Sequence, residues 1–333
     1  ELIDASIAHL RGRSFKLYPD FPTGGQADVS NYNDGLKGGK VRVRARIQDN
    51  GNRTLSIVEI PFGTTTGSLI ESILKANDKG KIKIKKIEDN TAGKVEILIH
   101  LPAAVSIDKS IDALYAFTDC EVSLSPLACI VNEDKPEFLG VSEILRRNTD
   151  HTLQLLKEEL EIRLHELQEQ WHFASLERIF IRERIYRDIE EANNWEEVIS
   201  IIRKGLQPFI GELLRAVTDD DIVRLTEIRI KRITKFDSDK ANDHILHLEG
   251  EMDEVKNHLA HLVDYAINWF KALKKKHGKD KERKTELRLF DDIEATRVAM
   301  ANVKLYVNRE EGFIGTGLRK DEYLFDCSDI ADI

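Results

Sequence analysis

The sequence is poor in cysteine and has no long apolar run. Its three cysteines, Cys120, Cys129 and Cys327, lack the paired spacing of a zinc site, and so small a number excludes a disulfide scaffold. No apolar stretch approaches the roughly 20 residues of a membrane-spanning helix, and no signal peptide is visible. We therefore expect a cytoplasmic protein with no membrane partner.

The chain also lacks an excess of positive charge. It has 50 Lys and Arg residues against 59 Asp and Glu residues, for a formal net charge of −9. A polycationic nucleic-acid-binding protein is thereby excluded, so a surface for a polyanion has to be a local basic patch. The length of 333 residues predicts two or three domains. Because the first residue is Glu and strand-like sequence runs to the last residue, we expect a piece of a longer protein.

The most regular pattern lies between Asp239 and Lys276. Apolar residues alternate there at spacings of three and four: Ile245, Leu248, Met252, Val255, Leu259, Leu262, Ala266, Trp269 and Leu273. A pattern sustained over about four heptads predicts a long helix that forms one strand of a coiled coil. At about 1.5 Å per residue, such a helix extends far beyond a compact domain. It therefore needs a partner.

The predicted partner is a second long helix at 142–176. Its apolar residues follow the same spacing: Leu153, Leu160, Leu164, Leu167, Trp171 and Ala174. The two helices predict an antiparallel hairpin with a small all-α globule, 177–238, at its tip. The alternative is a single helical bundle. The hairpin is favoured because neither helix has the wide apolar stripe that burial inside a bundle requires.

A basic strand is predicted at 40–47. Lys40, Arg42, Arg44 and Arg46 alternate there with Val41, Val43, Ala45 and Ile47, so the four cations share one face. Like charges on one face repel each other unless an anion lies over them. A second basic alternation follows at Lys81, Lys83 and Lys85, and Lys37 precedes the first. These eight residues are the candidate contacts to a polyanion, for which duplex DNA is the natural choice. The alternative is a solvated outer face of the sheet.

The surrounding pattern predicts an α+β domain. Further strands are expected at 55–60 and 95–101, with helices at 67–77 and 106–118. After the long helix predicted at 239–276, short strands are expected at 303–307 and 312–318. The predicted fold class is therefore multidomain α+β: a sheet domain, a long antiparallel coiled-coil hairpin with an all-α tip, and the first strands of a C-terminal β domain.

Three other patterns have a structural and a functional interpretation. The loop 63–68 stands before a helix and could hold a phosphate, but it lacks the Lys and spacing of a P-loop, so helix capping is favoured. The acidic run 219–221 is expected to cap a helix that continues to Ile233, because successive helix residues do not converge on one metal ion. The pairs His244–His247 and His258–His261 are three apart but have no clear third ligand, so no metal site is predicted.

Several segments together carry a family resemblance: Pro19-Asp-Phe-Pro-Thr-Gly-Gly25, Gly39-Lys-Val-Arg-Val-Arg-Ala-Arg46, Glu59-Ile-Pro-Phe62 with Leu69-Ile-Glu-Ser-Ile73, and Leu225-Thr-Glu-Ile-Arg-Ile-Lys-Arg-Ile-Thr234. In this order they resemble the A subunit of bacterial type IIA DNA topoisomerases, gyrase and topoisomerase IV. The likeness covers nearly the whole chain. The segments 302–307 and 313–317 look more like the topoisomerase IV form.

The resemblance implies a division of the chain. It places a tower-like α+β domain that flanks DNA at 1–132 and a first coiled-coil arm at 140–176. A helical C-gate dimerisation domain follows at 177–238, and the second arm lies at 239–278. A return helix or linker is expected at 279–301, before the incomplete start of a β-pinwheel-like C-terminal domain at 302–333.

The resemblance also implies a function. The full enzyme of this family passes one DNA duplex through another with ATP, as relaxation, decatenation or supercoiling, and is associated with the nucleoid. The resemblance implies a homodimer joined through the tip, which acts as an exit gate, and a B subunit that carries Mg²⁺ and ATP. No cofactor is expected in this chain.

The family's nucleophilic Tyr belongs to a winged-helix domain that precedes the tower. None of the seven tyrosines of this chain lies in that motif. No catalytic residue is therefore expected, and we predict that the chain alone does not cleave DNA. The alternatives are a coiled-coil scaffold whose basic sheet binds an acidic protein, and an enzyme acting at the tower loops.

Overall fold

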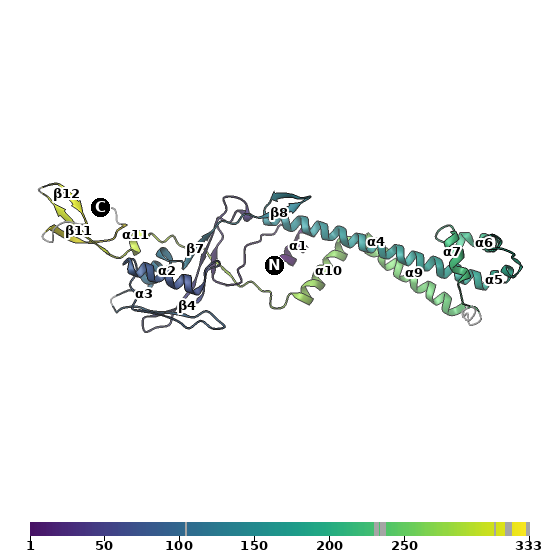
Figure 1. Ribbon diagram of the computed structural model, residues 1–333, viewed down its shortest axis with the longest axis horizontal. Coiled ribbons are helices and arrows are strands. Elements are labelled where there is room, and N and C mark those ends of the chain that lie inside the picture. The colour runs from purple at the N-terminus through teal and green to yellow at the C-terminus, as the bar shows by residue number, and fades with distance from the viewer. Residues whose placement is uncertain (104, 230–232, 234–237, 310, 317–321, 331–333) are drawn as a thin grey trace. The chain divides into compact units, whose positions relative to one another are not determined.

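The structure is a computed structural model. It describes residues 1–333 apart from 104, 230–232, 234–237, 310, 317–321 and 331–333 (Figure 1). The chain divides into two compact units. The first comprises Glu1–Ala5, Ser14–Arg146 and Lys276–Ile333, and the second comprises Ser6–Arg13 and Arg147–Lys275. The short helix α1 (Leu2–Leu10) contributes residues to both.

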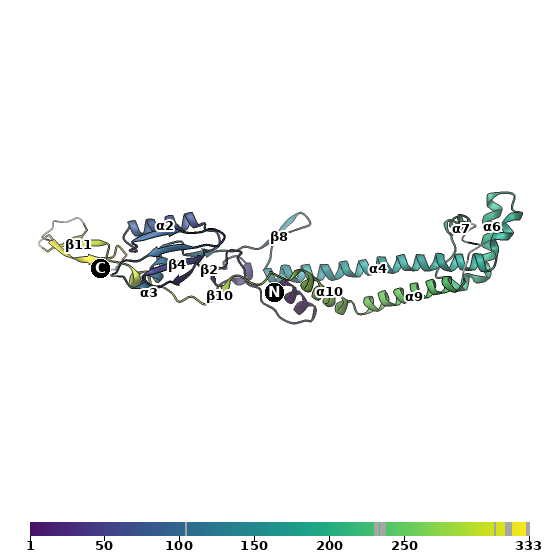
Figure 2. The same cartoon turned by 90° about the horizontal axis from the view of Figure 1, so that it is seen from below.

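One antiparallel sheet of the first unit carries the larger core. Its strands, in spatial order, are β3 (Arg46–Asp49), β4 (Thr54–Glu59), β6 (Ile97–His100) and β5 (Lys86–Asp89). Alternate residues Leu55, Ile57, Ile97 and Ile99 are fully buried on one face. That face packs against α2 (Thr66–Asp78) and α3 (Ile107–Phe117), which lie beside the sheet in Figure 2.

A capping box begins α2. The N–H of Ser68 donates to Thr65 Oγ1 at 3.1 Å, and the N–H of Thr65 donates to Ser68 Oγ at 3.0 Å. Each side chain thus satisfies a backbone group that the first helical turn leaves without a partner. The capping interpretation of the loop 63–68 is confirmed.

A second sheet of the first unit has the order β10 (Glu286–Leu287), β1 (Gln26–Asp28), β2 (Val41–Arg44) and β7 (Glu121–Leu124). The pair β1–β10 is parallel, and the pairs β1–β2 and β2–β7 are antiparallel. Ala27, Tyr32, Val41 and Val43 form its buried cluster. A separate hairpin joins β8 (Cys129–Asn132) to β9 (Lys135–Phe138).

The single basic strand predicted at 40–47 is wrong. The chain leaves one sheet after Arg44 and enters the other at Arg46, so β2 and β3 belong to different sheets. Ala45 lies at the crossing, is fully buried, and donates its N–H to the carbonyl of Cys120 at 2.8 Å. Period-two alternation continues through such a crossing, so it does not reveal the change of partner.

The second basic strand is also displaced, because β5 begins only at Lys86. The preceding segment, 81–85, is irregular because other contacts hold it. The side chain of Ile82 is buried in the larger core, and the N–H of Ile84 donates to Asn77 Oδ1 at 3.0 Å. The remaining predicted helices and strands of this region are present.

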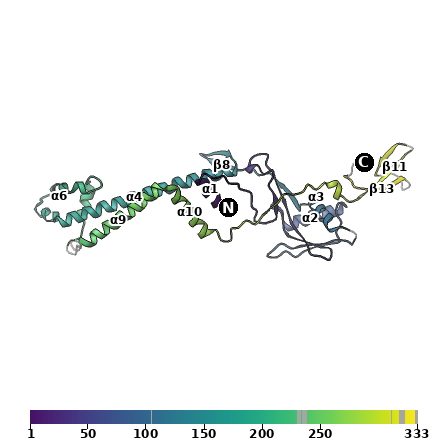
Figure 3. The same ribbon diagram turned by 180° about the vertical axis from the view of Figure 1, so that it is seen from behind.

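Long helices dominate the second unit. They are α4 (Val141–Arg182), which begins in the first unit, α9 (Ser238–Ala260) and α10 (Leu262–His277). Leu160 and Leu167 of α4 pack against Leu248, Met252 and Val255 of α9. Polar contacts flank this seam, with Trp171 Nε1 2.9 Å from Glu249 Oε1 and Arg163 Nη2 3.0 Å from Glu251 Oε2. Figure 3 shows α9 alongside α4.

The helix predicted at 239–276 is interrupted at His261, between α9 and α10. Beyond this point the predicted apolar spacing holds at Leu262, which packs against the seam, and at Ala266, which is fully buried, but not at Trp269. Ala266, Ile267 and Phe270 form the buried face of α10, whereas Trp269 is 38% exposed. The covered face of α10 therefore includes Ile267 and Phe270 but not Trp269.

Shorter helices form the apolar cluster at the end of α4. They are α5 (Ile185–Asp188), η2 (Ile189–Glu191), α6 (Trp195–Leu206), η3 (Gln207–Glu212) and α7 (Asp219–Thr226). Ile202, Leu206, Ile222 and Leu225 pack against Leu176, Ile179 and Phe180 of α4. Thr218 and Asp221 cap α7 reciprocally, as predicted. The helix ends at Thr226 rather than at Ile233, and residues 230–232 of the predicted segment lie outside the described residues.

The predicted C-terminal strands are present as β11 (Val303–Asn308) and β12 (Phe313–Gly315), with β13 (Tyr323–Cys327) on the other side of β11. Residues 317 and 318 of the second predicted strand lie outside the described residues. The stretch 279–301, expected as a return helix or linker, is all described, and no helix spans it. That stretch contains only β10 and the four-residue helix α11 (Ala295–Val298). Its backbone pairs with β1 instead, where the N–H of Arg288 donates to the carbonyl of Ala27 at 3.0 Å.

Candidate functional site

One carboxylate connects two of the predicted site arginines. Arg42 and Arg44 point from the same face of β2, and Glu121 stands opposite Arg44 on β7. Nε of Arg42 donates to Glu121 Oε1 at 2.8 Å, and Nε of Arg44 donates to Glu121 Oε2 at 2.5 Å. Arg44 is only 10% exposed and Glu121 only 19% exposed. This charge-assisted arrangement neutralises much of the basic face from within the chain.

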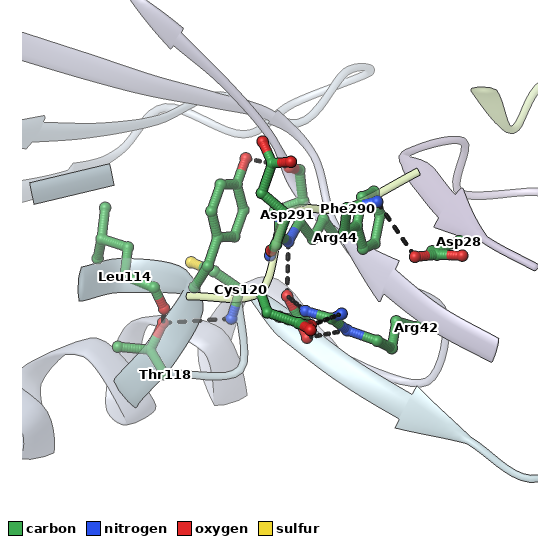
Figure 4. Close-up of polar contacts among 12 residues, drawn as sticks. Asp28, Arg42, Arg44, Leu114, Thr118, Cys120, Phe290 and Asp291 are labelled. Carbon is green, nitrogen blue, oxygen red and sulfur yellow. Dashed lines mark hydrogen bonds and ion pairs between the residues drawn. The ribbon is translucent and has the colours of Figure 1, made fainter. Parts of the chain in front are cut away.

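Phe290 packs against Arg42 and Arg44, and we call these three residues, with Glu121, the cluster. The ring centre of Phe290 lies 4.2 Å from the guanidinium carbon of Arg44 and 5.6 Å from that of Arg42. Tyr115 provides a second ring, 4.7 Å from the same carbon of Arg44. A guanidinium near the face of an aromatic ring is attracted by the ring's quadrupole. Figure 4 shows Phe290 beside Arg44, with its backbone N–H directed to Asp28 at 3.1 Å.

Arg46 is paired in the same manner, although it belongs to the other sheet. Its Nε donates to Glu59 Oε2 at 2.9 Å, and its Nη1 lies 2.9 Å from Glu286 Oε2. Glu59 Oε2 also accepts the N–H of Gly25 at 2.6 Å. The hypothesis that the basic face requires an external anion is therefore wrong for the arginines. All three arginines already donate hydrogen bonds to carboxylates of the chain.

The ionisation of the two outer arginines follows from these contacts. Hydrogen bonding to Glu121 raises the pKa of Arg42, and hydrogen bonding to Glu59 raises the pKa of Arg46. Both guanidinium groups therefore stay charged at neutral pH.

The pKa values of two neighbouring groups, Asp28 and Tyr115, also differ from their usual values. Burial would raise the pKa of Asp28, but hydrogen bonds from Ser30 and from the N–H of Phe290 lower it overall. Burial raises the pKa of Tyr115 to about 12. At neutral pH an ionised Asp28 and a neutral Tyr115 therefore lie beside the cluster.

A segment that we call the strap, residues 283–292, supplies Phe290. Arg283 fixes its beginning through Glu1, with Nη2 2.6 Å from Oε2, and through the carbonyl of Pro19, 2.8 Å from Nη1. Asp20 Oδ1 accepts the N–H groups of Lys284 and Thr285 at 3.0 and 2.8 Å. The loop 19–25, singled out in the sequence for its motif, therefore serves to hold the strap.

The predicted lysines lie outside the cluster. Lys37, Lys40, Lys83 and Lys85 are exposed, and none of them forms an ion pair with another residue that the structure describes. Lys81 is partly covered, with its Nζ 5.5 Å from the ring centre of Phe117. Lys37 and Lys40 precede β2, whereas 81–85 precedes β5 of the other sheet. The structure therefore does not bring the eight predicted residues into one cluster.

Sequence reasoning missed the residues that organise the site. Glu121 and Phe290 are separated from Arg44 by 77 and 246 positions, and no local pattern marks either as its partner. A long gap between partners leaves no periodic signal. The alternation at 40–47 pointed to the arginines of the site, and the family motif at 19–25 pointed to the loop that holds the strap.

No metal centre is found among the described residues, where no three His, Cys, Asp or Glu side chains converge. The members of the pair His258–His261 have other neighbours. The ring of His258 lies 4.7 Å from that of Tyr265, and His261 Nδ1 lies 3.0 Å from the carbonyl of Asn257. Of the helices described, none is both long and apolar enough to cross a membrane.

Comparison with known proteins identifies the family. Residues 1–273 match the family model for the A subunit of DNA gyrase/topoisomerase IV. The chain is 36% identical over 328 residues to the A subunit of DNA topoisomerase 4 from Borreliella burgdorferi, which covers 98% of this chain and 52% of that protein. It is 26% identical to the A subunit of DNA gyrase from Lawsonia intracellularis, covering 73% of this chain and 29% of that protein.

A third relative is the A subunit of DNA topoisomerase 4 from Staphylococcus aureus, which is 23% identical over 73% of this chain and 30% of that protein. The chain thus spans about half the length of the first of these relatives and less than a third of the other two. The match to the family model covers well over half of the 333 residues. The chain belongs to the family of DNA gyrase and topoisomerase IV A subunits.

Proposed function

We propose that this chain is the DNA-flanking and subunit-joining part of a type IIA topoisomerase A subunit. The full enzyme would pass one duplex through another with ATP. The observation that carries the proposal is the family match over residues 1–273. Mg²⁺ and ATP would belong to a partner B subunit, and the enzyme would act in the cytoplasm on the nucleoid. The preference for the topoisomerase IV form stays a prediction.

The proposed parts are a tower, a coiled-coil hairpin and a gate. The two sheets of the first unit would form the tower, and α4 with α9 would form the hairpin. The apolar seam of Leu160, Leu167 and Leu248 supports the hairpin, because its members follow the spacing of a coiled coil. The helices α5 to α7 would form the exit gate, through which two copies meet. Trp195, 50% exposed on α6, supports a contact there.

We further propose that lysines make the phosphate contacts of the tower. Lys37, Lys40, Lys81, Lys83 and Lys85 are the predicted cations without a carboxylate partner among the described residues. Arg44 and Arg46 would instead hold the sheets and the strap together. Contacts of this kind would give affinity for duplex DNA without sequence preference.

The test is duplex binding by the Lys83→Gln/Lys85→Gln variant at several salt concentrations. Each phosphate contact that is lost should reduce the slope of log K against log salt by roughly one. The control is Lys135→Gln, which removes one exposed lysine from the β8–β9 hairpin, so the changes in slope are compared per lysine removed. An unchanged slope in the double variant would contradict the lysine assignment. Equally tight binding of an acidic polypeptide would favour the scaffold alternative.

A further inference from the structure

Arg42 has two carboxylate partners of very different character. On its inner side, Nε and Nη2 face Glu121, whose side chain is largely covered. On its outer side, Nη1 donates to Asp292 Oδ1 at 3.0 Å, and the side chain of Asp292 is 95% exposed. One side of the guanidinium is therefore fixed within the fold, whereas the other holds a carboxylate that water surrounds.

The outer partner can leave without loss of the structure behind it. The strap is held as far as Phe290, whose ring lies against Arg44, and as far as Asp291, whose carbonyl accepts from Arg44 Nη2 at 3.3 Å. Asp292 is the next residue, and its side chain is the last part of the strap to touch the cluster. The segment that follows has no regular structure until α11 begins at Ala295. A rotation of the Asp292 side chain would leave the packing of Phe290 in place.

Replacing the Asp292 carboxylate by another anion should change the free energy of the fold little. An exposed ion pair contributes little to stability, because water screens it and the two side chains lose freedom. If Asp292 leaves, Arg42 keeps its bonds to Glu121 and no buried charge is left without a partner. A phosphodiester oxygen presents the same acceptor geometry to a guanidinium as a carboxylate oxygen.

We propose that Nη1 of Arg42 is a phosphate-binding position that Asp292 occupies when no nucleic acid is bound. The end of the strap is then an internal competitor of the phosphodiester backbone of a duplex. This inference rests on the proposed function, in which the tower binds duplex DNA. It adds Arg42 to the phosphate contacts of the exposed lysines, and it adds Asp292 as a carboxylate that competes with the phosphate for Arg42.

The chain offers a matched pair of variants for the test. Asp292→Asn and Asp291→Asn remove the same charge from adjacent positions, but only Asp292 uses its side chain on Arg42. Long-range repulsion of DNA is therefore relieved equally, and any difference between the two variants reports the local competition. Binding of a duplex oligonucleotide is measured from low to high salt, with unfolding curves to show that both variants fold.

The expected result is tighter binding by Asp292→Asn than by Asp291→Asn, roughly two- to fivefold at low salt, as suits one exposed charge pair. The difference should shrink as salt rises. In a double-mutant cycle, Arg42→Gln should abolish the gain from Asp292→Asn, because the position that gains the phosphate is then gone.

The contrary results are distinct. Equal affinities for the two Asn variants would overturn the inference while leaving the lysine contacts intact. A gain from Asp292→Asn that persists in the presence of Arg42→Gln would also overturn it. If the unmodified chain binds no duplex even at low salt, the proposed function fails, and this inference fails with it.

Discussion

Glu121 Oε2 lies 2.5 Å from Arg44 Nε, between neighbouring strands in which the two residues stand directly opposite each other. The same carboxylate also holds Arg42. Removing a partner from a covered ion pair leaves a charge that water no longer solvates. The relation between Glu121 and Arg44 therefore matters more for the stability of the sheet than an exposed pair would.

Glu121→Gln should lower the free energy of unfolding by about 2–4 kcal/mol, because two guanidinium groups lose their shared anion. Gln keeps the size of the side chain, so packing is preserved. Urea denaturation followed by circular dichroism measures the change. The control is Glu71→Gln, whose exposed pair with Lys75 should contribute less than about 1 kcal/mol. Equal effects of the two variants would contradict the role given to Glu121.

Phe290→Ala should release the strap. The ring is buried against Arg42 and Arg44, and a buried Phe that is cut to Ala costs about 3 kcal/mol or more. Hydrogen exchange should accelerate at the amides of Glu286 and Arg288, which bond to the carbonyls of Gly25 and Ala27. Leu289→Ala is the control, because Leu289 is exposed. Unchanged exchange at both amides in Phe290→Ala would show that other contacts suffice to hold the strap.

The fold was predictable where one face of a helix stays covered over many residues. The spacing of Leu160, Leu167 and Leu248 predicted both long helices and the residues that join them, because helical periodicity and burial coincide there. Beyond His261 it held at Ala266 but not at Trp269, because the buried face of α10 includes Ile267 and Phe270 and no residue type announces the change.

The site was less predictable for a different reason. Alternation at 40–47 identified the basic side chains but not their partners. Glu121, Asp292 and Phe290 reach them through strand pairing and through the strap, which are long-range contacts. Arg44 resembles an exposed cation in the sequence and is a nearly buried structural residue in the fold.

Leu167→Ala should destabilise the pairing of α4 with α9. Leu167 is fully buried in the seam, and truncation of a buried Leu costs about 2–5 kcal/mol. Thermal unfolding of the second unit's helices, followed by far-ultraviolet circular dichroism, checks this. Ile162→Ala serves as the control on the exposed side of the same helix. A similar loss in both variants would mean that helix propensity, and not the seam, is being measured.

His172 should make the second unit sensitive to acid. It is 1% exposed, with Nε2 3.5 Å from Asp221 Oδ2. Burial first, and then the nearby charge of Arg215, lower its pKa, against the opposing attraction of Asp221 and Glu169. The unfolded chain therefore takes up a proton at a higher pH than the folded chain. His172 therefore does not change the stability above the His pKa of the unfolded chain, about 6.5, and it lowers the stability as the pH drops below that value.

The His172→Gln variant isolates this effect. The loss of stability between about pH 7 and about pH 5.5 should be smaller in the variant than in the unmodified chain, as measured by urea denaturation at each pH. His165→Gln, at an exposed position of the same helix, is the control for the substitution itself. An identical loss in His172→Gln would assign the acid sensitivity to other groups.

Trp195→Glu should weaken self-association if the gate helices join two copies. An exposed Trp is a frequent centre of an interface, and a carboxylate there would have to be desolvated on contact. Sedimentation equilibrium should show a dimer for the unmodified chain and a 38.1 kDa monomer for the variant. Leu246→Glu, at an exposed site on α9, is the control and should remain dimeric. A dimeric Trp195→Glu variant would place the contact elsewhere.

The salt dependence of duplex binding by the unmodified chain tests the central claim most directly. If the tower binds the phosphate backbone, two duplexes of unrelated sequence should bind with similar affinity. The slope of log K against log salt should be negative, at about 0.9 for each phosphate contacted. An affinity that does not change with salt, or the absence of duplex binding at low salt, would contradict the account.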